Sequence, residues 1–100
     1  MPETAGSLPS VLRELHNICP GVKFNVIFEC GNCCFKAKNV EDIDEKGGSL
    51  VLKSPECDFI RVFTINPRTV LKEKALAVVI PREKVCAIEV ESPECRQEGE

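Results

Sequence analysis

Residues 22–42, VKFNVIFECGNCCFKAKNVED, contain the clearest strand pattern in the sequence. In the first half of this stretch the apolar residues recur at every second position: Val22, Phe24, Val26 and Phe28. Its second half repeats this pattern with Cys33, Phe35 and Ala37. A period of two is typical of strands with one face in the core. Between the halves lies Gly31-Asn32, a turn pair that tolerates positive φ. The stretch predicts a β-hairpin with ECGNCCF at its tip.

One helix is expected before this hairpin. Five apolar residues recur there at helical spacing: Leu8, Val11, Leu12, Leu15 and Ile18. This spacing places them on one stripe of a helix. The run Cys19-Pro20-Gly21 follows and is suited to ending the helix, because proline restricts the residue before it and glycine frees the turn. The sequence therefore predicts a helix over residues 8–19.

Short strands are expected after the hairpin, at residues 49–53, 58–65, 76–80 and 85–90. Residues 68–74 are polar and basic, and we expect a loop there with one helical turn at most. Many short antiparallel strands in about 70 residues favour a small barrel, because closure removes exposed sheet edges. The predicted fold is mainly β, with one N-terminal helix. We expect one domain at 8–90, including an extended connection at 54–76, between a flexible start (1–7) and a flexible acidic tail (91–100).

Composition limits the classes of protein that this chain can represent. The 100 residues suit a single domain, and neither a long apolar run nor a signal peptide is present, so we expect a cytoplasmic protein without membrane contact. The net charge is −3, which disfavours a strong nucleic-acid binder because phosphate neutralisation carries most non-specific affinity. Residues 61–85 are locally basic, however, with 6 Lys/Arg against 2 Asp/Glu. They could form a basic face or simply a solvated edge.

The seven cysteines raise the question of metal and redox chemistry. Their odd number and the missing export signal favour reduced thiols. Cys30-x-x-Cys33 could be one half of a zinc site, a redox pair or a plain hairpin tip. No second C-x-x-C follows, and catalytic redox pairs usually open a helix, so the plain tip is the favoured interpretation. His16 is the single histidine and lies on the predicted helix. We therefore expect neither a cofactor nor enzyme activity.

Two stretches resemble the Sm-like (Lsm) family. The helix and residues 22–53 are similar to its first motif. Gly31 stands at the glycine of the family's hairpin tip, Ala37 stands near the position of a small residue in the family's second strand, and SLVL (49–52) matches the third strand. AVVIPREKVCAIEV (77–90) resembles its second motif, in which two short strands meet at a sharp turn. The resemblance covers about 8–53 and 77–90. Residues 54–76 are longer than the connection usual in the family.

The resemblance implies a strongly bent five-stranded antiparallel barrel that joins neighbouring copies into a ring through its edge strands. The family binds RNA in a pocket, and the resemblance implies that this base-binding pocket is altered or lost here. Ser49 stands where the family has an RNA-contacting asparagine, and Asp44 is one residue from the family's aspartate. Pro81-Arg82 replaces an arginine–glycine pair. The candidate nucleic-acid residues are Asp44, Ser49, Arg82 and Lys84.

Three functional hypotheses follow from the sequence. The first is a ring-forming homo-oligomer that binds RNA or another polyanion without catalysing a reaction. The second is an assembly scaffold that binds protein partners and no nucleic acid. The third is a zinc-stabilised domain with Cys30 and Cys33 as ligands. The basic segment favours the first hypothesis, whereas the acidic total and the altered site residues favour the second.

Overall fold

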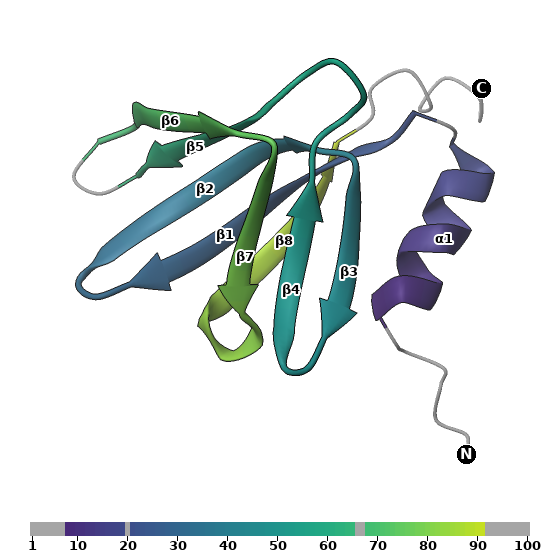
Figure 1. The fold of residues 1–100 in the computed structure, drawn as a ribbon, viewed down its shortest axis with the longest axis horizontal. Coiled ribbons are helices and arrows are strands. Elements are labelled where there is room, and N and C mark those ends of the chain that lie inside the picture. The colour runs from purple at the N-terminus through teal and green to yellow at the C-terminus, as the bar shows by residue number, and fades with distance from the viewer. Residues whose placement is uncertain (1–7, 20, 66–67, 92–100) are drawn as a thin grey trace.

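The computed structural model describes residues 8–19, 21–65 and 68–91. These residues form one helix, eight strands and a short 3-10 helix (Figure 1). In chain order the elements are α1 (Leu8–Ile18), β1 (Lys23–Cys30), β2 (Cys33–Val40), β3 (Asp42–Lys46), β4 (Ser49–Lys53), β5 (Ile60–Thr64), β6 (Val70–Ala75), β7 (Ala77–Pro81), η1 (Arg82–Lys84) and β8 (Val85–Glu91).

The strands form two antiparallel sheets. The larger sheet has the order β6-β5-β2-β1-β8, and the smaller one has the order β3-β4-β7. One residue, Glu41, separates β2 from β3, and one residue, Leu76, separates β6 from β7. Each of these two chain segments therefore bends out of one sheet and continues in the other. The segment β4–β5 also passes between the sheets, through residues 54–59.

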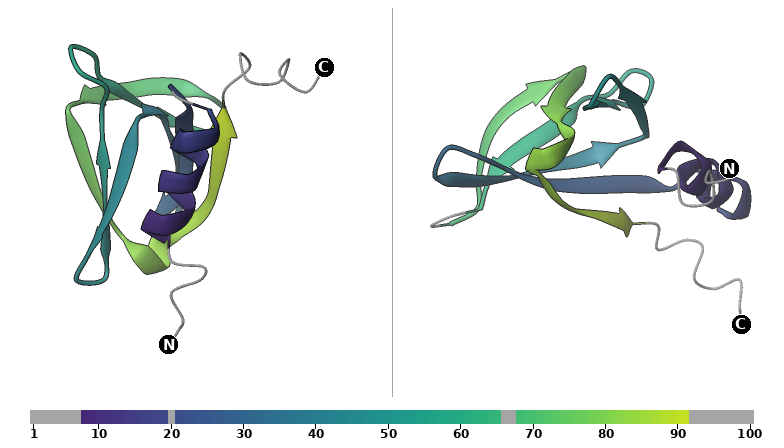
Figure 2. Two further views of the ribbon diagram at one scale, coloured as in Figure 1. Left: turned by 90° about the vertical axis from the view of Figure 1, so that its right-hand side faces the viewer. Right: turned by 90° about the horizontal axis from the view of Figure 1, so that it is seen from below.

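The hydrophobic core lies between the two sheets and under α1. Phe24 and Val26 contribute from β1, Leu50 and Leu52 from β4, and all four are at most 2% exposed. α1 adds Leu12, which is 3% exposed. The helix lies beside β3 (Figure 2, left), and the His16 ring meets the Phe24 ring edge-on with centroids 5.6 Å apart. The alternating residues that predicted the hairpin divide along its length. Val22, Phe24, Val26 and Ala37 are buried, Phe28 and Phe35 pack against the core, and Cys33 at the tip is exposed.

The central prediction from residues 22–42 is confirmed. β1 pairs with β2 in an antiparallel register that places Cys30 opposite Cys33, with Gly31 at a φ of 65° in the turn. The helix is also confirmed, and it ends one residue earlier than predicted, at Ile18. The flexible ends predicted at 1–7 and 91–100 lie outside the described residues, except that Glu91 ends β8.

The prediction of a loop at 68–74 is wrong. Residues 70–75 form β6, which pairs with β5 in register from Thr64↔Val70 to Ile60↔Ala75. Nearly every residue of β6 is exposed, so backbone pairing and not side-chain burial holds this strand. A strand of this kind leaves no hydrophobic alternation in the sequence, so residues 68–74 have the polar composition of a loop.

The described strands do not close into a barrel by backbone pairing. β3 and β7 are the edges of the smaller sheet, and β6 and β8 are the edges of the larger one. The two sheets therefore present unpaired edges on β3, on the β6–β7 segment and on β8, and α1 lies beside the first of these. In the part of the chain that the structure describes, no helix is long and apolar enough to cross a membrane.

Candidate functional site

Two turns meet at one end of the smaller sheet. The turn Gly47-Gly48 joins β3 to β4, and both glycines have positive φ, at 53° and 84°. Ser49 follows this turn and lies opposite Pro81 in the register of β4 with β7. The backbone N–H of Arg82 donates to the carbonyl oxygen of Gly48 at 2.9 Å. Ser49 and Arg82, 33 positions apart in the sequence, are therefore neighbours.

The charge of Arg82 is balanced within this end of the sheet. Its Nη1 lies 2.5 Å from Oε2 of Glu45, whose side chain is 21% exposed, whereas the Arg82 side chain is 64% exposed. An exposed ion pair of this kind contributes little to stability. It does hold the guanidinium group beside the turn. Lys84, two residues further along η1, is exposed.

Asp44 does not join this cluster. Successive residues of a strand point to opposite faces, so Asp44 turns away from the face that Glu45 and the buried Ile43 share. The residue that contacts Arg82 is Glu45, which the sequence analysis did not select. The alternation around Ile43 was the signal that could have identified it, because an inward residue at 43 places 45 on the same face.

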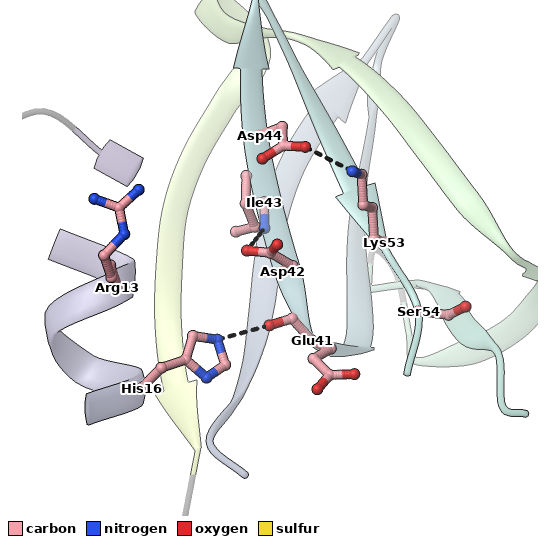
Figure 3. A pocket seen from close by; sticks show the side chains of 8 residues that line it. All are labelled: Arg13, His16, Glu41, Asp42, Ile43, Asp44, Lys53 and Ser54. Atoms are coloured by element: carbon pink, nitrogen blue, oxygen red, sulfur yellow. Dashed lines mark hydrogen bonds and ion pairs between the residues drawn. The ribbon is translucent and has the colours of Figure 1, made fainter. Parts of the chain in front are cut away.

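Asp44 lies instead in a cleft of about 450 Å³ between α1 and the β3–β4 pair (Figure 3). Eight residues line this cleft: Arg13, His16, Glu41, Asp42, Ile43, Asp44, Lys53 and Ser54. On the helix side, the Nε2 atom of His16 lies 3.0 Å from the carbonyl oxygen of Glu41. On the strand side, Asp42 Oδ1 accepts a hydrogen bond from the Ile43 N–H at 2.9 Å. His16 thus ties the helix to the start of β3.

Asp44 and Lys53 form the shortest contact of the cleft wall. Oδ2 of Asp44 lies 2.6 Å from Nζ of Lys53. This hydrogen bond, aided by the charges of Lys53 and Lys46, holds the pKa of Asp44 below its usual value. The same contact raises the pKa of Lys53 above its usual value. The two pKa shifts have one cause, the ion pair between Asp44 and Lys53, and each shift favours the charged form of the side chain.

This ion pair predicts a specific dependence of stability on acid. A carboxyl whose pKa is lowered by folding contributes stability above its unfolded pKa, which is about 4, and the contribution disappears as pH falls through the folded-state pKa. In Asp44→Asn this loss is absent. The free energy of unfolding of the wild type should therefore fall more steeply than that of the variant below about pH 4.

Urea unfolding of both proteins across the acid range measures this difference. Lys53→Met should remove the same acid dependence, because it deletes the partner of Asp44. If wild type and Asp44→Asn lose stability in parallel as the pH falls, the ion pair plays no part in the stability of the fold.

The cysteines at the hairpin tip are exposed. Cys30 and Cys33 carry free thiols, as do Cys34, Cys57 and Cys86. Cys19 is disulfide-bonded, so the expectation of reduced thiols is wrong at that position. Among the residues that the structure describes, no group of three or more His, Cys, Asp or Glu side chains is arranged to hold a metal ion. The Cys30–Cys33 pair therefore offers only two ligands to a metal ion.

Comparison of the chain with models of protein families, with curated proteins and with solved structures found no match.

Proposed function

We propose that this protein is a divergent, non-catalytic Sm-like assembly module that joins copies of itself edge to edge into a ring. The observation that carries the proposal is two of the unpaired edges, those on the β6–β7 segment and on β8, whereas α1 lies beside the third, on β3. The arrangement of the chain supports it as well. A helix is followed by five strand segments, at 23–30, 33–46, 49–64, 70–81 and 85–91, and the three in the middle bend between the sheets. The Sm-like resemblance implies the same layout of one helix and five bent strands.

The exposed apolar side chains support assembly at these edges. Four of the large ones belong to the β6–β7 segment: Val70, Leu71, Leu76 and Val79. Val79 is 63% exposed, and on β8 Val90 is 52% exposed. Edge strands of monomeric proteins usually carry charged residues that prevent pairing with another chain. Apolar residues beside two open edges are typical of an interface between chains.

The backbone of β7 is free to accept another strand. Arg82 N–H donates to Gly48 O at 2.9 Å, and Leu76 O accepts from Ser54 N–H at 3.1 Å. Even-numbered residues from 76 to 82 therefore direct their backbone groups towards residues 48–54, which include β4. Because this direction alternates along an antiparallel strand, the N–H and C=O of Val79 point to the open edge. Pro81 has no N–H and also lies at an outward position, where proline is tolerated.

The open edge of β8 follows from the register in the same way. Cys34 O accepts from Ile65 N–H at 3.1 Å, so even-numbered residues of β2 face β5 and odd-numbered ones face β1. Asn25 and Ile27 then face β8, opposite Glu89 and Ala87. The backbone groups of Val90 consequently point outward. Pairing β7 of one copy with β8 of the next joins unlike surfaces, and such contacts give a ring when the rotation closes.

Proline substitutions test this assembly. Val79→Pro removes the outward N–H of β7, and Val90→Pro removes that of β8, so each variant should be monomeric. Because each variant keeps one intact edge, an equimolar mixture should form a dimer. Multi-angle light scattering measures the masses, and circular dichroism confirms that both variants are folded. Val79→Ile keeps both the N–H group and an apolar side chain and should assemble like the wild type.

Other outcomes would contradict the proposed assembly. Folded proline variants that keep the mass of the wild type would show that these edges do not form the contact. Two monomeric variants that do not combine when mixed would show that the contact does not join β7 to β8.

A second candidate function is binding of RNA or another polyanion at the two turns. The observation that favours it is the proximity of Ser49 and Arg82, with Lys84 exposed in the same turn region. In a ring, every copy would repeat this cluster. The ion pair between Arg82 and Glu45 reduces the free positive charge, so we expect weak binding that depends on salt.

The measurement is the affinity for a uridine-rich oligonucleotide at low and at moderate salt. Arg82→Glu should weaken binding at both salt concentrations. Lys84→Gln should lower the slope of log affinity against log salt by about 1, if one phosphate contact is lost. Lys23→Gln, far from the two turns in the sequence, serves as the control and should leave the slope unchanged. Absence of binding even at low salt would leave assembly as the proposed function.

A further inference from the structure

The hairpin tip brings two thiols to one face of the sheet. Cys30 ends β1 and Cys33 begins β2, and the two residues are opposite each other in the register. Directly opposed residues of an antiparallel pair point to the same face. Cys34 and Glu29 form the next pair of the register, so they point to the other face. The exposed thiols of Cys30 and Cys33 are therefore a pair, and Cys34 is not part of it.

Their spacing suits metal chelation. Directly opposed Cβ atoms lie about 4.5–5.5 Å apart, whereas a disulfide prefers a Cβ separation of about 3.8 Å. Two thiolates bound to one tetrahedral zinc ion, with Zn–S bonds of about 2.3 Å, lie about 3.8 Å from each other. Rotation about each Cα–Cβ bond can bring two sulfur atoms to that distance without moving the strands. The pair is thus placed to hold a thiophilic cation more readily than to form a bond with itself.

The described part of one chain supplies only these two ligands. A closed structural zinc site takes four, and no third His, Cys, Asp or Glu is grouped with the pair in residues 8–19, 21–65 and 68–91. A second copy of the tip supplies the same two thiolates and completes a four-cysteine set. Such a contact is self-complementary, because each copy offers the identical surface.

The position of the tip permits this approach. The β1–β2 turn projects at the end of the molecule opposite α1 (Figure 2, right). Cys30, Gly31, Asn32 and Cys33 are all exposed. β7 and β8 do not contribute to the tip, so two tips can meet while the edges proposed for ring assembly remain open.

We propose that Cys30 and Cys33 are one half of a zinc site, which the same two cysteines of a second copy complete. Binding converts four thiols and one Zn²⁺ into a tetrathiolate complex and releases four protons, with no change in oxidation state. The contact is separate from the edge-strand interface. Zinc would therefore pair two monomers if the chain does not form rings, and two rings if it does.

The test uses full-length protein with the Cys19 disulfide intact, treated with chelator and titrated with Zn²⁺ alone. We expect one zinc per two chains by metal analysis and a doubling of the mass of the zinc-free species, reversed by EDTA. Cys30→Ser and Cys33→Ser should each lose both effects. Cys34→Ser is the matched control, because this neighbour lies on the opposite face, and it should behave like the wild type.

The outcomes separate this inference from the proposed function. The mass of the zinc-free protein reports on ring assembly, whereas the doubling reports on the zinc contact. The inference is overturned if no zinc binds, or if zinc binds at one per chain without a change in mass. It is also overturned if Cys34→Ser loses the site as fully as Cys30→Ser does.

Discussion

Replacing Phe24 by alanine is expected to lower the free energy of unfolding by about 3–5 kcal/mol. Phe24 is completely buried. It lies opposite Val40 of β2 and opposite Val90 of β8, and its ring meets the edge of the His16 ring. Truncation would leave a cavity where the hairpin, the last strand and the helix meet, and a packed core collapses only partly around such a space.

Phe59→Ala is the control for this prediction. Phe59 is 44% exposed, so its truncation should cost less than about 1 kcal/mol. Urea unfolding followed by circular dichroism measures both variants under the same conditions. Equal losses for Phe24→Ala and Phe59→Ala would contradict the placement of the core between the two sheets.

Leu12→Ala is expected to lower the free energy of unfolding by about 2–5 kcal/mol. Leu12 is 3% exposed and, with the partly buried Leu15, packs α1 on the core. An isolated helix of 11 residues is marginal in water, so α1 depends on this packing and on the contact of His16 with Glu41. Loss of Leu12 should therefore weaken the helix and the fold together.

Val11→Ala provides a control from the same helix turn. Val11 is 41% exposed, so its truncation should change the free energy of unfolding by less than about 1 kcal/mol. The experiment again compares urea unfolding curves. A small effect of Leu12→Ala, equal to that of Val11→Ala, would mean that α1 does not pack on the sheets in solution.

The hairpin and the helix could be predicted from the sequence because each buries one regular face. Phe24 and Val26 are fully buried at alternate positions, and Leu12 and Leu15 pack on the core one helix turn apart. The pairing of Cys30 with Cys33 followed from the turn pair Gly31-Asn32. Patterns of period 2 and 3.6 carry this information directly.

The strand β6 could not be predicted in this way. Its residues, VLKEKA, are nearly all exposed and held by backbone hydrogen bonds to β5, which any side chain permits. The division into two sheets was also not predictable from periodicity. It depends on bends at Glu41 and at Leu76, where the chain passes from one sheet to the other.

The candidate site was predictable in part. The proximity of Ser49 and Arg82 follows from the register of β4 with β7, which no local pattern reveals, and the Sm-like resemblance pointed to both residues. The same resemblance led to Asp44, which the structure places in the cleft beside Lys53. Glu45 contacts Arg82 instead, because alternation along β3 puts it on the face of the buried Ile43.

The mass of the wild-type protein in solution shows whether copies of this chain join through the edges of β7 and β8. Light scattering over a concentration series with EDTA present removes any contribution from zinc. We expect one discrete oligomer larger than a dimer, because unlike edges that pair between copies continue until a ring closes. A single species at the mass of one chain, 11.1 kDa, up to high concentration would contradict the claim that the edges of β7 and β8 join neighbouring copies.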